Sequence, residues 1–110
     1  MSDQTTGQKK TRREMLEAFL AQKPDDAFAL YGLALECMNS GDVRSAEAHF
    51  RQLLEPAVSY VPAYLMFAQM LVRESRAEDA RQVLDQGIRA AARAGNAHAQ
   101  SEMEALLAEI

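Results

Sequence analysis

The sequence predicts an all-α protein, an α-solenoid of about six helices paired as antiparallel helix–turn–helix repeats. Three observations lead to this fold class. Apolar residues recur at helical spacing along most of the chain, and no segment alternates as a half-buried strand does. Capping residues and glycines divide the chain into short helices. The pattern of one helix pair returns after 34 residues, the distance from Gly41 to Ser75.

Helix boundaries follow from capping residues, which supply hydrogen bonds to the first free N–H groups of a helix. Glycine marks the opposite end, because it accepts the left-handed backbone that closes a helix. The predicted caps are Thr11 with Glu14, Asp26, Asp42, and Ser75 with Glu78. The predicted helices span about residues 12–22, 26–39 and 43–55, begin near Val61-Pro62 and after Ser75, and end with 97–109.

Composition excludes several classes of protein. The chain has 110 residues, enough for one domain, and a formal net charge of -4, without the basic surplus that nucleic-acid binding normally requires. Hydrophobic residues make up 48%, as in globular chains, and no apolar run approaches the roughly 20 residues of a membrane-spanning helix. We therefore expect no nucleic-acid partner and no membrane insertion.

The single cysteine and the polar start of the chain bear on its location. One cysteine cannot form an internal disulfide, which suits a reducing compartment. Residues 1–10 lack the apolar core of a secretory signal, and their polar composition predicts a disordered N-terminal tail. The basic cluster Lys9, Lys10, Arg12 and Arg13 is read as a solubilising part of this tail rather than an anion site. We expect a cytoplasmic protein.

The repeat is visible position by position. Leu33 and Ala34 fall on Phe67 and Ala68 at the 34-residue shift, so that large meets large and small meets small. Small residues let antiparallel helices approach closely while bulky ones fill the flanks. Gly87 departs from the pattern, because it stands where Leu53 stands, and it predicts a thinner core. The predicted divisions are a tail over 1–10 and one domain over 11–110, made of a half repeat (11–24), repeat one (27–60), repeat two (61–94) and a C-terminal capping helix (95–110).

These positions resemble the tetratricopeptide repeat (TPR) family over about residues 12–110. The first unit carries its pattern at Leu30, Leu33-Ala34, Cys37, Gly41, Ala46 and Phe50, and the second at Tyr64, Phe67-Ala68, Leu71, Ser75, Ala80 and Leu84. The resemblance implies a right-handed superhelix of stacked helix pairs. Pro56 and Val58 depart from the family's closing turn, so the junction between the units is expected to be distorted.

No constellation for catalysis or metal binding is present. His49 and His98 lie on different predicted helices, and Cys37 lies on a buried stripe, so the three lack the spacing of a zinc site or a catalytic pair. No glycine-rich phosphate loop occurs either. We expect no cofactor, no metal and no enzymatic activity.

The resemblance also implies a concave groove lined by the first helix of each unit. Carried over to this chain, the peptide-binding groove comprises Phe28, Tyr31, Leu35, Met38, Asn39, Leu65, Met66, Gln69, Val72 and Arg73. These residues give the two helices a second apolar face, which marks an interaction site or packs against neighbouring helices. The sequence leaves both interpretations open.

The composition of the groove restricts its ligand. Some family members hold C-terminal carboxylates with cations, but the corresponding positions here are Tyr31, Leu35, Met66, Asn96 and Gln100. An apolar peptide or an amphipathic helix fits better. We expect a non-enzymatic interaction module, a scaffold or adaptor with a protein partner of unknown identity. The alternative is a structural homo-oligomer, such as a homodimer, whose groove is filled by its own partner chain. The helix over 97–110 could cap the solenoid, extend the groove or dock into another chain.

Overall fold

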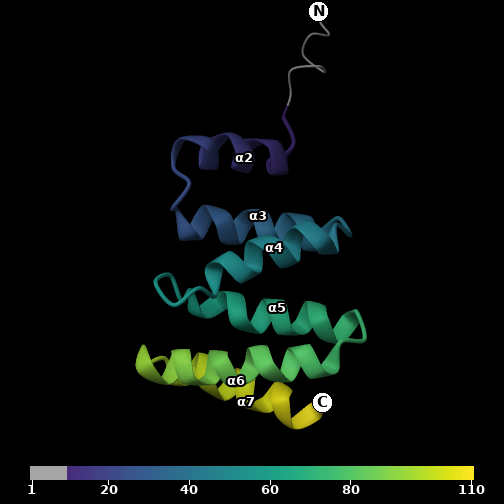
Figure 1. Ribbon diagram of the computed structural model, residues 1–110, viewed down its shortest axis with the longest axis vertical. Coiled ribbons are helices and arrows are strands. Elements are labelled where there is room, and N and C mark those ends of the chain that lie inside the picture. Colours follow the sequence, from purple (N-terminus) through teal and green to yellow (C-terminus); the bar gives the residue numbers. More distant parts are fainter. Residues whose placement is uncertain (1–9) are drawn as a thin grey trace, which may run out of the picture.

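The computed structural model describes residues 10–110, which form six helices and no strand, as predicted for an all-α repeat protein. The helices lie one after another along a stack of 55 × 28 × 20 Å, with α2 at one end and α7 at the other (Figure 1). Their bounds are α2 Arg12–Gln22, α3 Ala27–Asn39, α4 Val43–Leu53, α5 Val61–Arg73, α6 Ala77–Arg93 and α7 Ala97–Glu109. The predicted tail over 1–10 lies outside the described residues except for Lys10.

Three of the predicted caps are confirmed. The Thr11 hydroxyl accepts from the Glu14 N–H at 3.1 Å, and the Glu14 carboxylate accepts from the Thr11 N–H at 2.9 Å, which completes the capping box of α2. The carboxylates of Asp26 and Asp42 accept backbone N–H bonds at the starts of α3 and α4. These bonds satisfy donors that have no partner within the helix.

The predicted capping box at Ser75 and Glu78 is wrong. The cap of α6 is Arg76, which makes no side-chain capping bond. Ser75 instead adopts φ +62°, as Gly41 adopts φ +86°, so the turn keeps its left-handed residue in both units. Because the Arg76 N–H donates to the Leu71 carbonyl at 2.8 Å, this turn closes through its backbone.

The helix predicted over 43–55 ends earlier, at Leu53. The Leu53 carbonyl accepts from the Tyr60 N–H at 2.9 Å, so the loop folds back onto the end of α4. Ser59 in this loop has φ +42°, which is unusual for a residue with a side chain. The connection between the units therefore departs from a simple proline turn.

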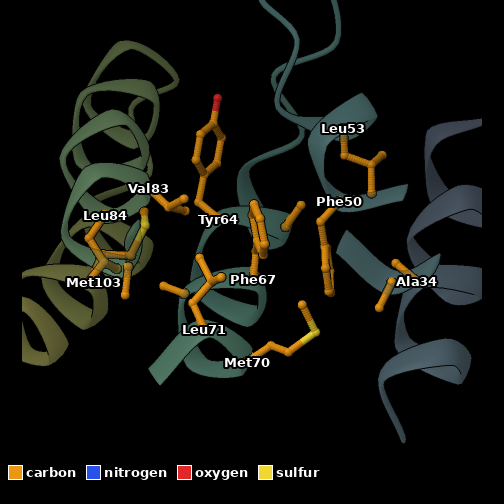
Figure 2. Close-up of a cluster of buried hydrophobic side chains, with 14 of the residues drawn as sticks. Ala34, Phe50, Leu53, Tyr64, Phe67, Met70, Leu71, Val83, Leu84 and Met103 are labelled. Atoms are coloured by element: carbon orange, nitrogen blue, oxygen red, sulfur yellow. The ribbon is translucent and has the colours of Figure 1, made fainter. Parts of the chain in front are cut away.

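The core runs through the stack between neighbouring helices. Phe50 of α4 and Phe67 of α5 stack with ring centroids 5.4 Å apart, and Figure 2 shows them where the two units meet. Alanines at the equivalent helix crossings are fully buried and allow close approach. They are Ala34, Ala46, Ala63, Ala68 and Ala80.

Gly87 does not leave the core thin. A Cβ at this position would lie 2.5 Å from the Met103 sulfur and 2.6 Å from the Tyr64 Cβ, so these side chains already occupy the space. Met103 is fully buried, and it anchors α7 against α5 and α6. The glycine is what allows the last helix to approach closely.

One ion pair between neighbouring units occurs twice with its charges exchanged. Arg13 donates to Asp42 at 3.0 Å, and Arg76 donates to Glu47 at 2.7 Å. Position 13 falls on 47 and position 42 falls on 76 at the repeat shift, so the two bonds are equivalent. Arg76 lowers the pKa of Glu47, and hydrogen bonds from Ser45 and then from Arg13 lower the pKa of Asp42.

Candidate functional site

The predicted groove residues lie on α3 and α5. Phe28 at the start of α3 is 75% exposed, the largest exposure among the large apolar side chains of the described residues. The other apolar members are partly buried, and the polar members lie at the surface. Partly buried are Tyr31, Leu35, Met38, Leu65, Met66 and Val72; exposed are Asn39, Gln69 and Arg73.

Five of these residues line two separate hollows, and the other five line neither of them. The first, the α2–α3 hollow, has a volume of about 370 Å³ and is mainly apolar. It brings Phe28, Tyr31 and Leu35 together with side chains of α2. Its full lining is Arg12, Leu16, Phe19, Asp26, Phe28, Ala29, Tyr31, Gly32 and Leu35.

The second hollow, the α5–α7 hollow, lies at the other end of the stack. It measures about 270 Å³ and brings Leu65 and Gln69 together with residues of α7. Its lining also includes Leu106 and Ala105, with the carboxylates of Glu102 and Glu109. This hollow is therefore flanked by negative charge.

Between the two hollows, α3 and α5 contact each other directly. The rings of Tyr31 and Tyr60 lie 5.3 Å apart, and the Arg73 guanidinium donates to the Met38 sulfur at 3.1 Å. Burial raises the pKa of the Tyr31 phenol. These predicted groove residues thus also hold the two repeats together.

Sequence reasoning missed the contribution of α2 to the site. Leu16 and Phe19 line the first hollow, although they fall on the buried residues Phe50 and Leu53 at the repeat shift. The signal was present, because a half repeat lacks the helix that covers these positions in a full repeat. For α7, the sequence left open whether the helix caps the solenoid, extends the groove or docks into another chain, and Leu106 of this helix lines the α5–α7 hollow with Leu65.

Two further hollows are lined by residues outside the predicted groove. One of about 470 Å³ lies beside Pro24, Leu30 and Val58, and one of about 320 Å³ lies beside His49. The His49 Nδ1 is buried there and makes no hydrogen bond with the described residues. Glu17 and Gln52 line the same hollow, but neither accepts from or donates to this nitrogen, so the arrangement does not form a hydrogen-bonded catalytic pair.

The described residues also hold no group of three or more His, Cys, Asp or Glu placed to bind a metal ion. Cys37 is fully buried, and burial raises the pKa of its thiol, which disfavours the reactive thiolate. None of the helices in residues 10–110 is long and apolar enough to cross a membrane.

Short antiparallel helices in a regular stack, alanines at the crossings and a recurring pattern define an α-helical repeat protein. No protein-family profile matches the chain. A TPR repeat-containing protein of Pseudomonas aeruginosa is 28% identical over 97 residues, which cover 88% of this chain and 92% of that protein. The solution NMR structure of a tetratricopeptide repeat domain protein from Salinibacter ruber is similar in fold, with a TM-score of 0.73 and 30% identity over 78% of this chain and 87% of that one. The chain belongs to the tetratricopeptide repeat family.

Proposed function

We propose that this protein is a non-enzymatic adaptor that binds an apolar peptide or an amphipathic helix of another protein along α3 and α5. The observation that carries the proposal is the exposure of Phe28 beside a mainly apolar hollow. Exposed apolar patches of this kind are typical of interaction sites. TPR repeats serve generally in protein–protein interaction, which agrees with this assignment.

The charges around the two hollows restrict the ligand further. Glu102 and Glu109 flank the α5–α7 hollow, so an acidic segment or a free carboxylate is disfavoured there. Arg73 and Gln69 are exposed on α5 and can orient a bound segment by hydrogen bonds. We therefore expect a segment with apolar anchors and neutral or basic flanks.

We assign the protein no catalytic role. His49 and His98 lie on different helices, α4 and α7, and Cys37 is buried in the core. A cytoplasmic location remains a prediction from the sequence.

Photo-cross-linking in cells tests the proposal. A photo-reactive amino acid at Leu65, on the proposed groove side, should capture a partner protein, while the same group at the exposed Gln82 of α6 should not. Leu35→Arg should weaken the cross-link at Leu65, because a charge then lies on the binding face. Equal capture from both positions, or no effect of Leu35→Arg, would contradict the proposal.

The alternative function is structural, a homo-oligomer in which a second copy fills the groove. The exposed aromatic ring of Phe28 favours this assignment as much as it favours a foreign partner. Identification of the cross-linked species separates the two, because a homo-oligomer gives only products that contain this chain.

A further inference from the structure

Exposed apolar side chains concentrate at one end of the stack. Met15 and Phe19 of α2 are 54% and 43% exposed, and Phe28 follows at the start of α3. Phe19, Phe28 and the partly buried Leu16 line the α2–α3 hollow, and Met15 lies on the same helix at the end of the molecule where α2 lies (Figure 1). In the described part of the chain, one further large apolar residue is exposed, Val58 at 44%, in the loop after α4.

The repeat shows what is missing at this end. Leu16 and Phe19 fall on Phe50 and Leu53, which are fully buried beneath the neighbouring α3 and α5. Among residues 10–110, no helix covers α2 as α3 covers α4. The end therefore exposes side chains of a type that the interior of the stack buries.

The opposite end is finished differently. On α7, the residues His98, Ser101 and Glu102 stand where α5 has Tyr64, Phe67 and Ala68, and all three are exposed. Polar residues at these positions suit a terminal helix that faces water. Head-to-tail stacking of copies would bury this polar face, whereas pairing through the two apolar ends would not.

Charges at the α2–α3 hollow are self-complementary. Arg12, at the start of α2, is 66% exposed; its Nε pairs with Glu36 of the same chain at 2.9 Å, and its two Nη groups have the capacity to bind a second carboxylate. Asp26 lies at the start of the antiparallel α3, at the other end of the hollow. A two-fold axis through the middle of the hollow exchanges these ends, so that each Arg12 faces Asp26 of the second copy. The Asp26 cap uses Oδ1, which leaves Oδ2 to accept such a bond.

We propose that the α2–α3 hollow is a dimerisation surface, through which two copies of this chain pair end to end about a two-fold axis. Phe28 of one copy packs against Leu16 and Phe19 of the other, and Arg12 pairs with Asp26 across the interface. The stack is 28 × 20 Å in cross-section, which suits a modest interface and a dimer that dissociates on dilution. The α2–α3 hollow is also one end of the groove assigned to a partner above, so a second copy and a partner compete for it, while the α5–α7 hollow stays open.

Sedimentation velocity of the full chain over a wide concentration range tests this inference. We expect a monomer–dimer equilibrium with no larger species. Phe28→Glu should raise the dimer dissociation constant at least about tenfold, because an aromatic side chain buried in an interface contributes strongly to binding. Phe28 is exposed in the single chain, so the substitution should leave the fold intact. Val58→Glu is the matched control, since it adds the same charge at an exposed apolar residue that does not line the hollow.

The charge pair has its own variants. Arg12→Gln and Asp26→Asn remove the two charges, and asparagine still caps α3. Each should weaken the dimer and reduce its sensitivity to salt. Circular dichroism of every variant verifies that the helices are retained.

Several results would overturn the inference. A strict monomer at the highest concentration excludes the dimer, and species larger than a dimer exclude the closed two-fold arrangement. An equal effect of Val58→Glu and Phe28→Glu excludes the proposed surface. If a chain without residues 1–9 dimerises while the full chain stays monomeric, that segment covers the hollow instead. The dimer is measured on the purified chain alone, so these outcomes do not require that a partner be captured at Leu65 in cells.

Discussion

Two glycines in helix interiors have opposite roles in this protein. Gly87 of α6 lies where the side chains of Tyr64 and Met103 leave no room for a Cβ. Gly32 of α3 has its nearest neighbour, a Leu16 methyl, at 3.6 Å from an added Cβ, which is an ordinary contact distance. Only the first glycine is required by packing, although both sit within helices where alanine is intrinsically preferred.

Gly87→Ala should therefore destabilise the protein, by about 1–3 kcal/mol, because the added methyl forces α5 or α7 to move. Gly32→Ala should instead stabilise it, by up to about 1 kcal/mol, through helix propensity. Urea unfolding followed by circular dichroism measures both changes. Equal effects of the same sign would show that packing at Gly87 is not the reason for its glycine.

At the scale of elements, the repeat shift predicts backbone geometry better than it predicts side-chain roles. Ser75 occupies the left-handed position of Gly41, and Arg76 stands at the cap position of Asp42. Arg76 cannot accept a hydrogen bond as Asp42 does, so it pairs with Glu47 of the preceding unit. The same junction is thereby held with the opposite arrangement of charge.

The pair of Glu47 and Arg76 makes stability depend on pH. Arg76 holds the pKa of Glu47 below its ordinary value of 4.5. The pair's contribution to the free energy of unfolding is complete above that value and is lost as the pH falls through the lower pKa that Glu47 has in the folded state. Glu47→Gln should cost a few tenths to about 1 kcal/mol at neutral pH.

Urea unfolding at a series of pH values measures the difference in unfolding free energy between wild type and Glu47→Gln. This difference should vanish once the pH is below the folded-state pKa of Glu47. Glu55→Gln is a matched control, an exposed carboxylate in the loop after α4, and it should change stability little at any pH. A constant difference at all pH values would show that Glu47 acts through packing and not through its charge.

At the scale of the whole molecule, each helix packs chiefly on the next one along the chain, and α7 also reaches α5. Stability in such a stack is a sum of contacts between neighbours, so a destabilising change in one unit also weakens the unit packed against it. Cys37 lies in the core of the first unit, while Leu35, two residues earlier, lines the surface hollow.

Cys37→Arg should unfold the protein, because an unpaired buried charge costs about 3–5 kcal/mol, close to the whole stability of a small domain. Leu35→Arg should cost less than about 1 kcal/mol, since a long arginine can extend into water from a surface hollow. Thermal unfolding followed by circular dichroism compares the two. Similar melting temperatures for both variants would contradict the division into core and surface.

The sequence by itself determined the helices, most of their caps and the alternation of large and small residues in the core. These features depend on residues within one or two turns of each other, or on a pattern that repeats at a constant interval. Thr11 and Glu14 cap α2 through hydrogen bonds within one turn. Ala34 and Ala68 occupy matching buried positions because they are related by the 34-residue repeat.

Only the tertiary structure decided how the surface is organised. It brought only five of the predicted groove residues into two hollows, placed Leu16 and Phe19 in one of them and filled the space beside Gly87 with Met103. Each of these outcomes depends on which helix lies against which, and so on contacts between residues far apart in the chain. Periodicity along one helix specifies which face is apolar, but the neighbouring helix decides whether that face is covered.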